Sequence, residues 1–321
     1  MPSFVDGSAF GGTKLFSEGL IPTGNAVYQI PSHKFFALGF ARGDQGADKF
    51  IANLDNVSSS DSNKISKAIL ELEESPWGLR SRAYGLVSHN QGTTISFTRE
   101  EMTSLWANVL GSETVGFDVN RSVMDRFSIT WSSQGRFYYG STLRIERWSL
   151  GSTYKELGIF SQSANLSQAK NLLDYSETQN SSLTYALDAF TGIEIADSVR
   201  LAIQANRLKT RDLGDVKEVP QFRGGAQIDL GTTVQLTLES DINEAMRIPF
   251  PVKQKTSAVS LKVKANTLIT FAIGAEKKTM NGQQTTKMGL NAWITGKKHN
   301  FGAGFQYGQD TTPMGFTWKI Q

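Results

Sequence analysis

The sequence predicts an all-β protein: an antiparallel transmembrane β-barrel of about 14 strands, with an N-terminal plug-like segment and a short helical external loop. Three observations lead to this prediction. Apolar and polar residues alternate over most of the chain, short and long connections alternate, and the ends of the alternating segments are rich in aromatic residues. We expect residues 1–321 to form a single outer-membrane domain.

The alternation is clearest in the C-terminal half. In TVQLTLES, Val234, Leu236 and Leu238 alternate with polar residues, and GLNAWIT places Leu290 and Ile294 in the same way. Successive side chains of a strand point to opposite faces, so each of these strands has one apolar face and one polar or small face. A soluble β-sandwich with one solvated face shows the same pattern. A soluble binding protein therefore stays open as an alternative from alternation alone.

The connections favour the membrane interpretation. Tight turns are expected near 196–198, 230–232, 265–266 and 296–299, and longer polar loops at 209–220, 240–256, 277–285 and 308–313. Outer-membrane barrels have short periplasmic turns and longer external loops. Strand parity before residue 182 stays open, because SSQGRFYYGS at 132–141 fits either a turn or the middle of one long strand.

The aromatic residues and the strand length favour an apolar face that points toward lipid. The expected strands, roughly 8 to 12 residues long, exceed the usual soluble length. Aromatic girdles at the membrane interfaces are expected from Phe137, Tyr138, Tyr139, Trp148, Tyr185, Phe190, Phe301, Tyr307 and Trp318. The residues predicted to contact outer-membrane lipids are Leu201, Ile203, Leu236, Leu261, Leu290, Phe301, Phe305, Phe316 and Trp318. The opposite, lumen-facing set is Arg200, Gln235, Glu239, Lys262, Lys264, Lys287, Asn291 and Lys319.

Two segments depart from a plain barrel. Residues 47–76 place Ile65, Ile69 and Leu72 at helical spacing, with Pro76 as a stop, which predicts a helical loop insertion. Residues 149–181 form a mixed polar stretch that we interpret as a long external loop with a helical turn. Loops of this length are often functional.

Composition and motifs exclude several classes of function. The 33 basic and 30 acidic residues are dispersed, which argues against nucleic-acid binding. The absence of cysteine excludes disulfides and thiolate chemistry, and the three histidines, His33, His89 and His299, lie far apart. No GxSxG, P-loop or HExxH motif occurs. We therefore predict no enzyme activity, metal or cofactor. The first 20 residues lack a secretory signal, so we expect a mature chain whose signal peptide has been removed.

The N-terminal stretch GSAFGGTKLFSEGLIPTGNAVYQIPSHKFFALGF resembles the opening of FadL-type outer-membrane barrels and of the related TraF-like and PorV-like proteins. Gly11 and Gly12 match the glycine pair of that family. Asn25 and Ala26 match the start of its Asn-Pro-Ala stretch, although the proline is absent here. The helical insertion, together with DRFSIT at 125–130 and the segment 197–208, is most similar to the TraF-like branch.

The resemblance implies a barrel in the bacterial outer membrane whose residues 1–33 enter the lumen as a plug. It implies a protein that binds or passes hydrophobic solutes or lipids, with a lateral opening in the wall. An apolar pocket would then be formed by Phe4, Phe10, Phe16 and Leu20. The alternative is a non-transporting structural barrel that forms a homo-oligomer or scaffolds an assembly with another envelope protein.

Overall fold

The computed structural model describes residues 35–45, 67, 77–89, 93–109, 114–133, 135–158, 180–208, 211–213, 216–247, 252–280, 282–308 and 314–320. The predicted plug, residues 1–33 with Phe4, Phe10, Phe16 and Leu20, lies outside this set. So does the predicted helical loop 47–76, except for Lys67, which is helical. No helix within the described ranges has the length and apolar character needed to span a membrane.

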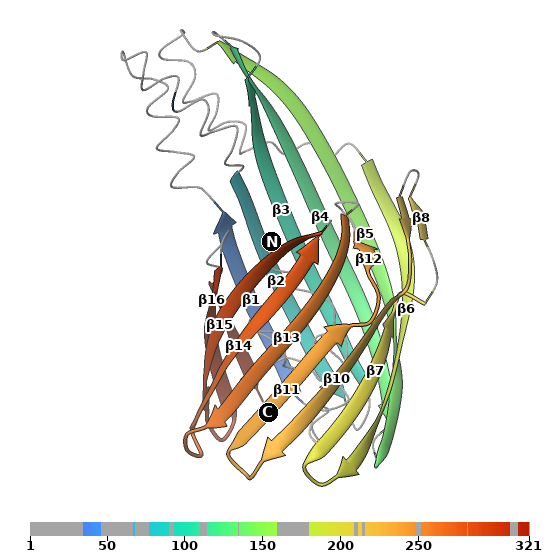
Figure 1. Cartoon of the computed structure of the whole chain (residues 1–321), viewed down its shortest axis with the longest axis vertical. Helices are drawn as coiled ribbons and strands as arrows, with labels where there is room; N and C mark the ends of the chain where they lie inside the picture. Colours follow the sequence, from blue (N-terminus) through green and yellow to red (C-terminus); the bar gives the residue numbers. More distant parts are fainter. Residues whose placement is uncertain are drawn as a thin grey trace.

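The described part of the chain is built from antiparallel strands (Figure 1). Their bounds are β1 Phe35–Gln45, β2 Trp77–His89, β3 Thr93–Val109, β4 Thr114–Ser133, β5 Phe137–Gly158, β6 Asn180–Ala196, β7 Val199–Asn206, β8 Arg211–Leu213, β9 Val216–Glu218, β10 Gln221–Leu230, β11 Val234–Asp241, β12 Ala245–Arg247, β13 Val252–Lys264, β14 Ile269–Met280, β15 Gln283–Thr295, β16 His299–Gly308 and β17 Met314–Ile320. The prediction of an all-β antiparallel fold is confirmed.

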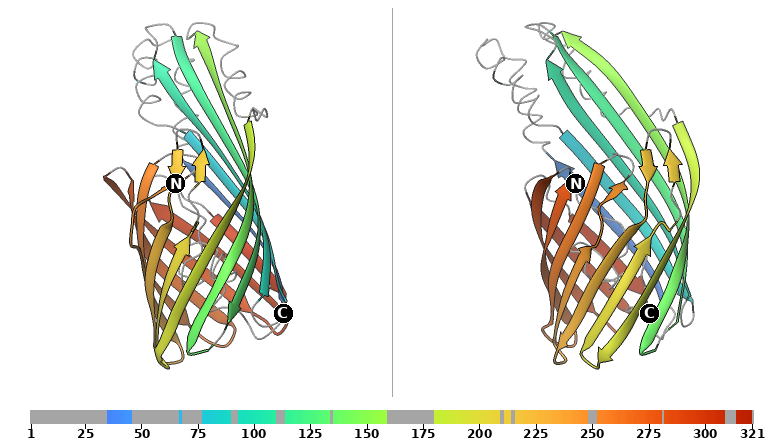
Figure 2. Two further views of the ribbon diagram at one scale, coloured as in Figure 1. Left: turned by 90° about the vertical axis from the view of Figure 1, so that its right-hand side faces the viewer. Right: turned by 45° about the vertical axis from the view of Figure 1, so that its right-hand side comes forward.

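One sheet contains all of these strands except the β8–β9 hairpin. Its order is β11-β10-β7-β6-β5-β4-β3-β2-β1-β17-β16-β15-β14-β13-β12. The first strand pairs with the last, with Phe36 opposite Ile320. In addition β11 pairs with β13, with Val234 opposite Val263, and the three-residue β12 pairs with the start of β13. The sheet curls round as a strongly bent wall (Figure 2).

From β6 to β14 short and long connections alternate, as the sequence predicts. The turns at one end of the sheet are short, such as 197–198, 231–233 and 265–268, and Gly231 there has a left-handed φ of 76° that glycine adopts without strain. A turn at Gly135 and Arg136 also separates β4 from β5, which settles the parity of the N-terminal half. The predicted loop 277–285 is wrong, because β14 continues to Met280 and β15 begins at Gln283.

Strands β3, β4 and β5 are much longer than expected, with 17, 20 and 22 residues. They rise well beyond the other strands at the end opposite the short turns (Figure 2). The predicted loop 149–181 is therefore wrong up to Gly158, where β5 ends opposite Thr114 of β4. The sequence analysis missed this part of β5 because its side chains are mixed and polar and show no apolar alternation. Backbone pairing between β4 and β5 does not require an apolar face.

Candidate functional site: the two faces of the sheet

Side chains along each strand alternate between an exposed and a buried face of the curled sheet. In β7, Leu201 and Ile203 are exposed, whereas Ala202 and Gln204 between them are buried. We call the exposed side the outer face and the buried side the inner face. Their chemistry is inverted relative to a soluble protein, since the exposed side chains are largely apolar and the buried ones largely polar.

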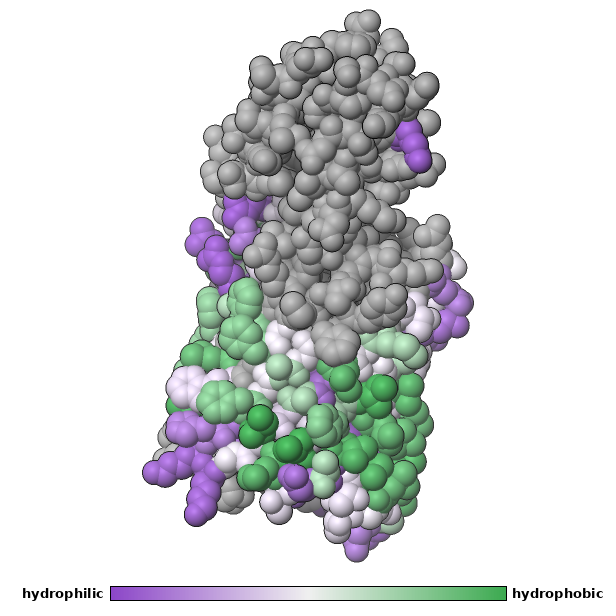
Figure 3. Space-filling view, turned by 90° about the vertical axis from the view of Figure 1, so that its left-hand side faces the viewer, coloured by the Kyte–Doolittle hydropathy of each residue, from purple (hydrophilic) through white to green (hydrophobic). Residues whose placement is uncertain are grey.

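The outer face carries a broad apolar band over most strands, part of which is visible as the green surface in Figure 3. Monomeric soluble proteins rarely expose apolar patches larger than a few hundred Å². The exposed apolar side chains of this band include Phe36, Leu38, Phe40, Phe97, Phe127, Leu143, Leu187, Leu201, Ile203, Leu238, Val259, Phe271, Ile273, Met288, Leu290, Phe301 and Phe316.

The band ends abruptly toward the long loops. Phe97 lies opposite Phe127, and one step further on the same face Arg99 lies opposite Asp125. The Arg99 and Asp125 side chains form an ion pair at 3.6 Å, and Arg147 of β5 lies opposite Asp125 on its other side. Three charged residues on adjacent strands, Arg99, Asp125 and Arg147, thus follow directly on the Phe97–Phe127 pair.

Aromatic rings mark the other limit of the band, near the short turns. Phe137 and Tyr139 are more than 60% exposed at the start of β5. Further round the sheet, the rings of Phe301 and Trp318 stack with centroids 6.5 Å apart. Aromatic side chains are enriched at both interfaces of membrane barrels because their rings are amphipathic.

The residues predicted to face lipid all lie on strands of this sheet. Exposed on the outer face are Leu201, Ile203, Leu290, Phe301 and Phe316. Leu236, Leu261 and Trp318 share that face but are half-buried, and the side chain of Phe305 lies outside the described set. Contact of these residues with lipid stays a prediction.

Three of the predicted girdle aromatics belong to the inner face instead. Tyr138, Trp148 and Phe190 are buried, so their assignment to an interfacial girdle is wrong. The Tyr138 ring lies over Gly192, and the Phe190 ring lies over Gly140. A side chain at either glycine would overlap the ring, so the glycines create the space. Tyr138 also donates a hydrogen bond from its hydroxyl to the Leu201 carbonyl at 2.6 Å.

The inner face of β4 and β5 holds a buried charge network centred on Glu146. Arg126 Nε donates to Glu146 Oε1 at 2.8 Å, and both side chains are almost fully buried. Arg144 approaches the same carboxylate at 3.8 Å and Arg207 at 3.5 Å. Trp148 adds a hydrogen bond from its Nε1 to Glu146 Oε2 at 3.3 Å. One carboxylate therefore holds groups from β4, β5 and the end of β7.

Asp188 on β6 completes this network. It forms an ion pair with Arg144 and accepts a hydrogen bond from the backbone N–H of Arg207 at 2.8 Å. Arg207 follows β7 directly and has a φ of 56°, a left-handed value that is uncommon for a residue other than glycine. The backbone contact with Asp188 and the side-chain contact with Glu146 hold it there. The described contacts of this network join three arginines to two carboxylates.

A second inner-face cluster joins β10, β11 and β13. Asp241 accepts a hydrogen bond from Arg223 Nε at 2.7 Å and another from the backbone N–H of Thr256, also at 2.7 Å. All three residues are buried. Asp241, at the end of β11, thus links this strand to β10 through Arg223 and to β13 through Thr256.

Several predicted lumen residues lie on the inner face. Glu239 and Asn291 are buried there, Gln235 donates to Asp229 at 2.7 Å, and Arg200 pairs with Glu194 at 3.3 Å. The side chains of Lys287 and Lys319 are outside the described set. The sequence analysis missed the Glu146 network, although LRIERW placed Arg144 and Glu146 two residues apart and hence on one face. Within the described ranges no group of His, Asp or Glu side chains could hold a metal ion.

Strand β6 is paired unequally along its length. On the β5 side pairing continues to Asn180, but on the β7 side it begins only at Ala189, with one further hydrogen bond from Leu208 N–H to the Leu187 carbonyl. From Asn180 to Tyr185, no described strand pairs with the edge of β6 that faces β7. The exposed side chains Leu183 and Tyr185 lie on this segment.

No protein-family model matches the chain, and no curated protein sequence matches it either. Solved structures do. A TodX deltaS2S3 mutant monoaromatic hydrocarbon channel superposes with a TM-score of 0.61 at 8% identity, covering 95% of this chain and 94% of that one. The Pseudomonas putida toluene transporter TodX gives 0.58 at 8% identity, covering 98% and 97%. A Pseudomonas aeruginosa FadL homologue gives 0.53 at 9% identity, covering 98% of each chain.

At identities this low the likeness concerns the fold alone. The chain shares its fold with outer-membrane channels of the FadL type, which confirms that part of the resemblance seen in the sequence. None of these structures bears on the TraF-like or PorV-like branch, so that finer assignment stays a prediction.

Proposed function

We propose that the protein is an outer-membrane β-barrel that passes hydrophobic solutes across the membrane. The observation that carries this proposal is the inverted chemistry of the sheet. An exposed apolar band, bounded by the Arg99–Asp125 row and by interfacial aromatics, surrounds a buried polar inner face. Only a membrane makes such an exposed band stable, and a closed barrel leaves no unpaired backbone in hydrocarbon. The fold shared with a hydrocarbon channel supports a hydrophobic cargo.

The finer features of the proposal follow the sequence prediction. The curled sheet closes into a barrel, residues 1–33 enter it as a plug, and residues 47–76 form a helical loop on the side of the long connections. The signal peptide is removed on export. Outer-membrane lipids contact the apolar band. Closure of the sheet is supported by the pairing of β1 with β17 and of β11 with β13, which joins strands that are far apart in the sequence.

We propose that the solute leaves through an opening in the wall of the barrel and does not travel along the whole length of the barrel interior. The inner face of β4 to β7 carries buried charge, which disfavours an apolar solute there. The upper segment of β6 offers an alternative, because its edge is unpaired among the described strands and its exposed side chains are apolar. We propose this segment as the lateral opening, with Phe4, Phe10, Phe16 and Leu20 lining the pocket beneath.

Uptake of radiolabelled toluene tests the function. Gram-negative cells that lack a hydrocarbon channel would express the chain or a variant with residues Phe4, Phe10, Phe16 and Leu20 changed to serine. We expect faster initial uptake with the parent chain and a return to background with the variant, at equal amounts in the outer membrane. Sucrose uptake is the control, since a non-specific pore would raise it as well. Uptake equal to that of cells without the protein would refute the proposal for this solute.

The alternative, a structural barrel that binds copies of itself or another envelope protein, is favoured by two observations. Strands β3 to β5 rise far beyond the apolar band, and the upper edge of β6 lacks a described partner strand. Unpaired edges are templates for pairing with another chain. Native mass spectrometry after mild extraction separates the two functions: a discrete multimer or a stable hetero-complex, together with background toluene uptake, would support the alternative.

A further inference from the structure

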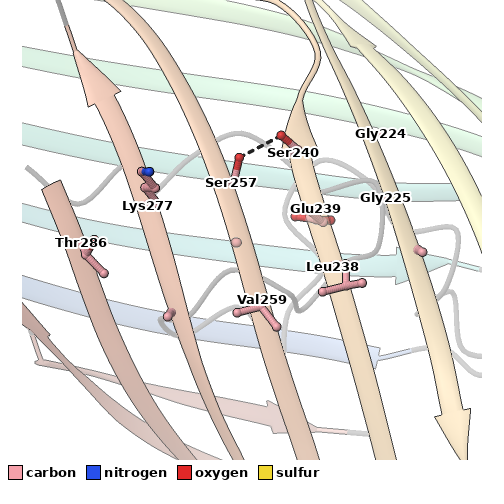
Figure 4. A pocket seen from close by; sticks show the side chains of 12 residues that line it. Gly224, Gly225, Leu238, Glu239, Ser240, Ser257, Val259, Lys277 and Thr286 are labelled. Carbon is pink, nitrogen blue, oxygen red and sulfur yellow. Dashed lines mark hydrogen bonds between the residues drawn. The ribbon is translucent and has the colours of Figure 1, made fainter. Parts of the chain in front are cut away.

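A groove of about 570 Å³ crosses five neighbouring strands of the sheet, from β10 to β15. Its floor and walls come mainly from small and apolar residues (Figure 4). They include Gly224 and Ala226 of β10, Leu238 of β11, Val259 of β13 and Ala275 of β14. This volume lies within the range of small-molecule sites.

The groove opens on the outer face. Leu238 and Val259 are about 40% exposed, whereas Thr237 and Ser260, beside them in the chain, are buried on the inner face. The groove therefore belongs to the same surface as the apolar band, and a molecule that occupies it comes from the membrane rather than from the interior of the sheet.

The floor suits an apolar chain. Gly224 has no side chain, and a Cβ there would meet only Ile242 Cδ1 at 3.8 Å, an ordinary contact distance. The hydroxyls of Ser240 and Ser257 bond to each other at 2.8 Å, so they do not need a polar ligand (Figure 4). A hydrocarbon chain lying here would desolvate no unpaired hydroxyl.

Lysines stand at the end of the groove that faces the long connections. Lys277 lies opposite Ser257 and lines the groove, and Lys255 and Lys253 follow Ser257 on the same face of β13. No ion pair joins these lysines to a described acidic residue. Glu239, which is among the residues lining the groove, and Glu276 are buried on the inner face, and Glu244 between β11 and β12 is exposed. Among the described residues of β13 and β14, the outer face carries Lys253, Lys255 and Lys277 and no acidic residue, so this part of the outer face is net positive.

We propose that this groove binds one molecule of a phosphate-bearing acylated glycolipid of the outer leaflet, of the lipid A class. An acyl chain lies across Gly224, Ala226 and Ala275, and a phosphate is held by Lys277 and Lys255. Charge complementarity selects an anionic head group, since basic side chains at a membrane surface attract anionic lipids. The outer leaflet is chosen because the lysines lie toward the long connections, the external side of such barrels. The inference rests on the proposed membrane placement.

Native mass spectrometry of the full chain in detergent, titrated with purified lipid A, tests this site. We expect a one-to-one adduct that Lys277→Gln weakens about fivefold, since one basic residue near the surface contributes about 1 kcal/mol. Gly224→Leu fills the floor without a backbone clash and is expected to abolish the adduct. The matched controls are Lys297→Gln, an exposed lysine in a short turn, and Ala303→Leu, an exposed small residue of β16 outside the groove. Neither control is expected to change binding.

Each other outcome overturns the site as proposed. Equal adducts in all four variants would show that lipid A binds elsewhere. Equally tight binding of phosphatidylglycerol, or full competition by inorganic phosphate, would replace lipid A with a general anion site. A dimer that Gly224→Leu disrupts would identify a second copy of the chain as the occupant. Toluene uptake in the same variants separates this inference from the function, because loss of lipid A with normal uptake leaves the function standing.

Discussion

Arg126 Nε and Glu146 Oε1 lie 2.8 Å apart on adjacent strands, and both side chains are almost completely buried on the inner face of the sheet. The same carboxylate is shared with Arg144 and Arg207. Glu146 therefore balances cations from three parts of the chain. The energetic role of such a shared buried anion differs from that of an exposed pair, because its loss leaves several buried cations with one carboxylate fewer.

The first prediction is that Glu146→Gln strongly destabilises the protein. Arg126 would lose the Glu146 carboxylate while staying buried, and breaking a buried pair on one side costs roughly 3–5 kcal/mol. The measurement is equilibrium unfolding by guanidinium chloride in detergent, followed by tryptophan fluorescence. Asp125→Asn is the matched control, since it breaks the half-exposed pair with Arg99. An exposed pair contributes roughly 0–1 kcal/mol. Equal losses in the two variants would contradict a special role for Glu146.

The second prediction concerns the packing of Tyr138 on Gly192. In Gly192→Ala, the new methyl group overlaps the Tyr138 ring, which must move and give up its hydrogen bond to the Leu201 carbonyl. Overpacking of this kind costs roughly 1–3 kcal/mol. The free energy of unfolding in detergent measures it.

Gly85→Ala is the control for this effect. The nearest atom to a Cβ at residue 85 is Leu38 Cδ2 at 3.5 Å, an ordinary contact, so we expect a change within about 0.5 kcal/mol. The double variant with Tyr138→Leu should recover part of the loss at residue 192, since the ring that clashes is gone. If the double variant recovered no stability, overlap with the Tyr138 ring would not be the cause of the loss in Gly192→Ala.

How much the sequence could predict depended on the physical signal. Period-two alternation predicted β7, β11 and β13 and the orientation of Leu201 and Ile203, because the exposed face of these strands is apolar and the buried face is polar or small. The same signal failed for β5 beyond Trp148, since a strand outside the apolar band has no such constraint. The inward rings of Tyr138 and Phe190 were missed because their space comes from Gly192 and Gly140 on neighbouring strands, a relationship that only the strand register reveals.

The charge network shows the same limit. Arg144 and Glu146 share a face by spacing alone, but Arg126, Asp188 and Arg207 join them only through the pairing of β4 to β7. The sequence signal for this network was the presence of charged residues on the small or polar face of consecutive strands. Their pairing could not be inferred while the turn at Gly135 was unassigned, since a shift of one residue moves every side chain to the other face.

The third prediction is that Asp188→Asn loosens the end of β7 locally. The Asp188 carboxylate holds the Arg207 backbone N–H, and Arg207 occupies a left-handed conformation that costs free energy. A neutral amide binds this N–H and Arg144 more weakly. We expect faster hydrogen exchange of the Arg207 and Leu208 amides by mass spectrometry. The Ile203 amide, within the ladder of β7 and β10, should keep its rate. A uniform rise along β7 would indicate global rather than local destabilisation.

The fourth prediction tests which face meets lipid, and it uses the absence of native cysteine. Single nitroxide labels at Ile203→Cys and Ile273→Cys should collide freely with oxygen, which concentrates in the bilayer core, and poorly with a water-soluble nickel chelate. Both residues are exposed on the outer face. Their chain neighbours Ala202 and Ala272 are buried on the inner face, so Ala202→Cys and Ala272→Cys are expected to show little collision with oxygen. Lys297→Cys, in an exposed short turn, should collide freely with the nickel chelate.

If the labels at residues 203 and 273 collided with the nickel chelate rather than with oxygen, the apolar band would face water. The membrane placement, and the lipid site that depends on it, would then both fail.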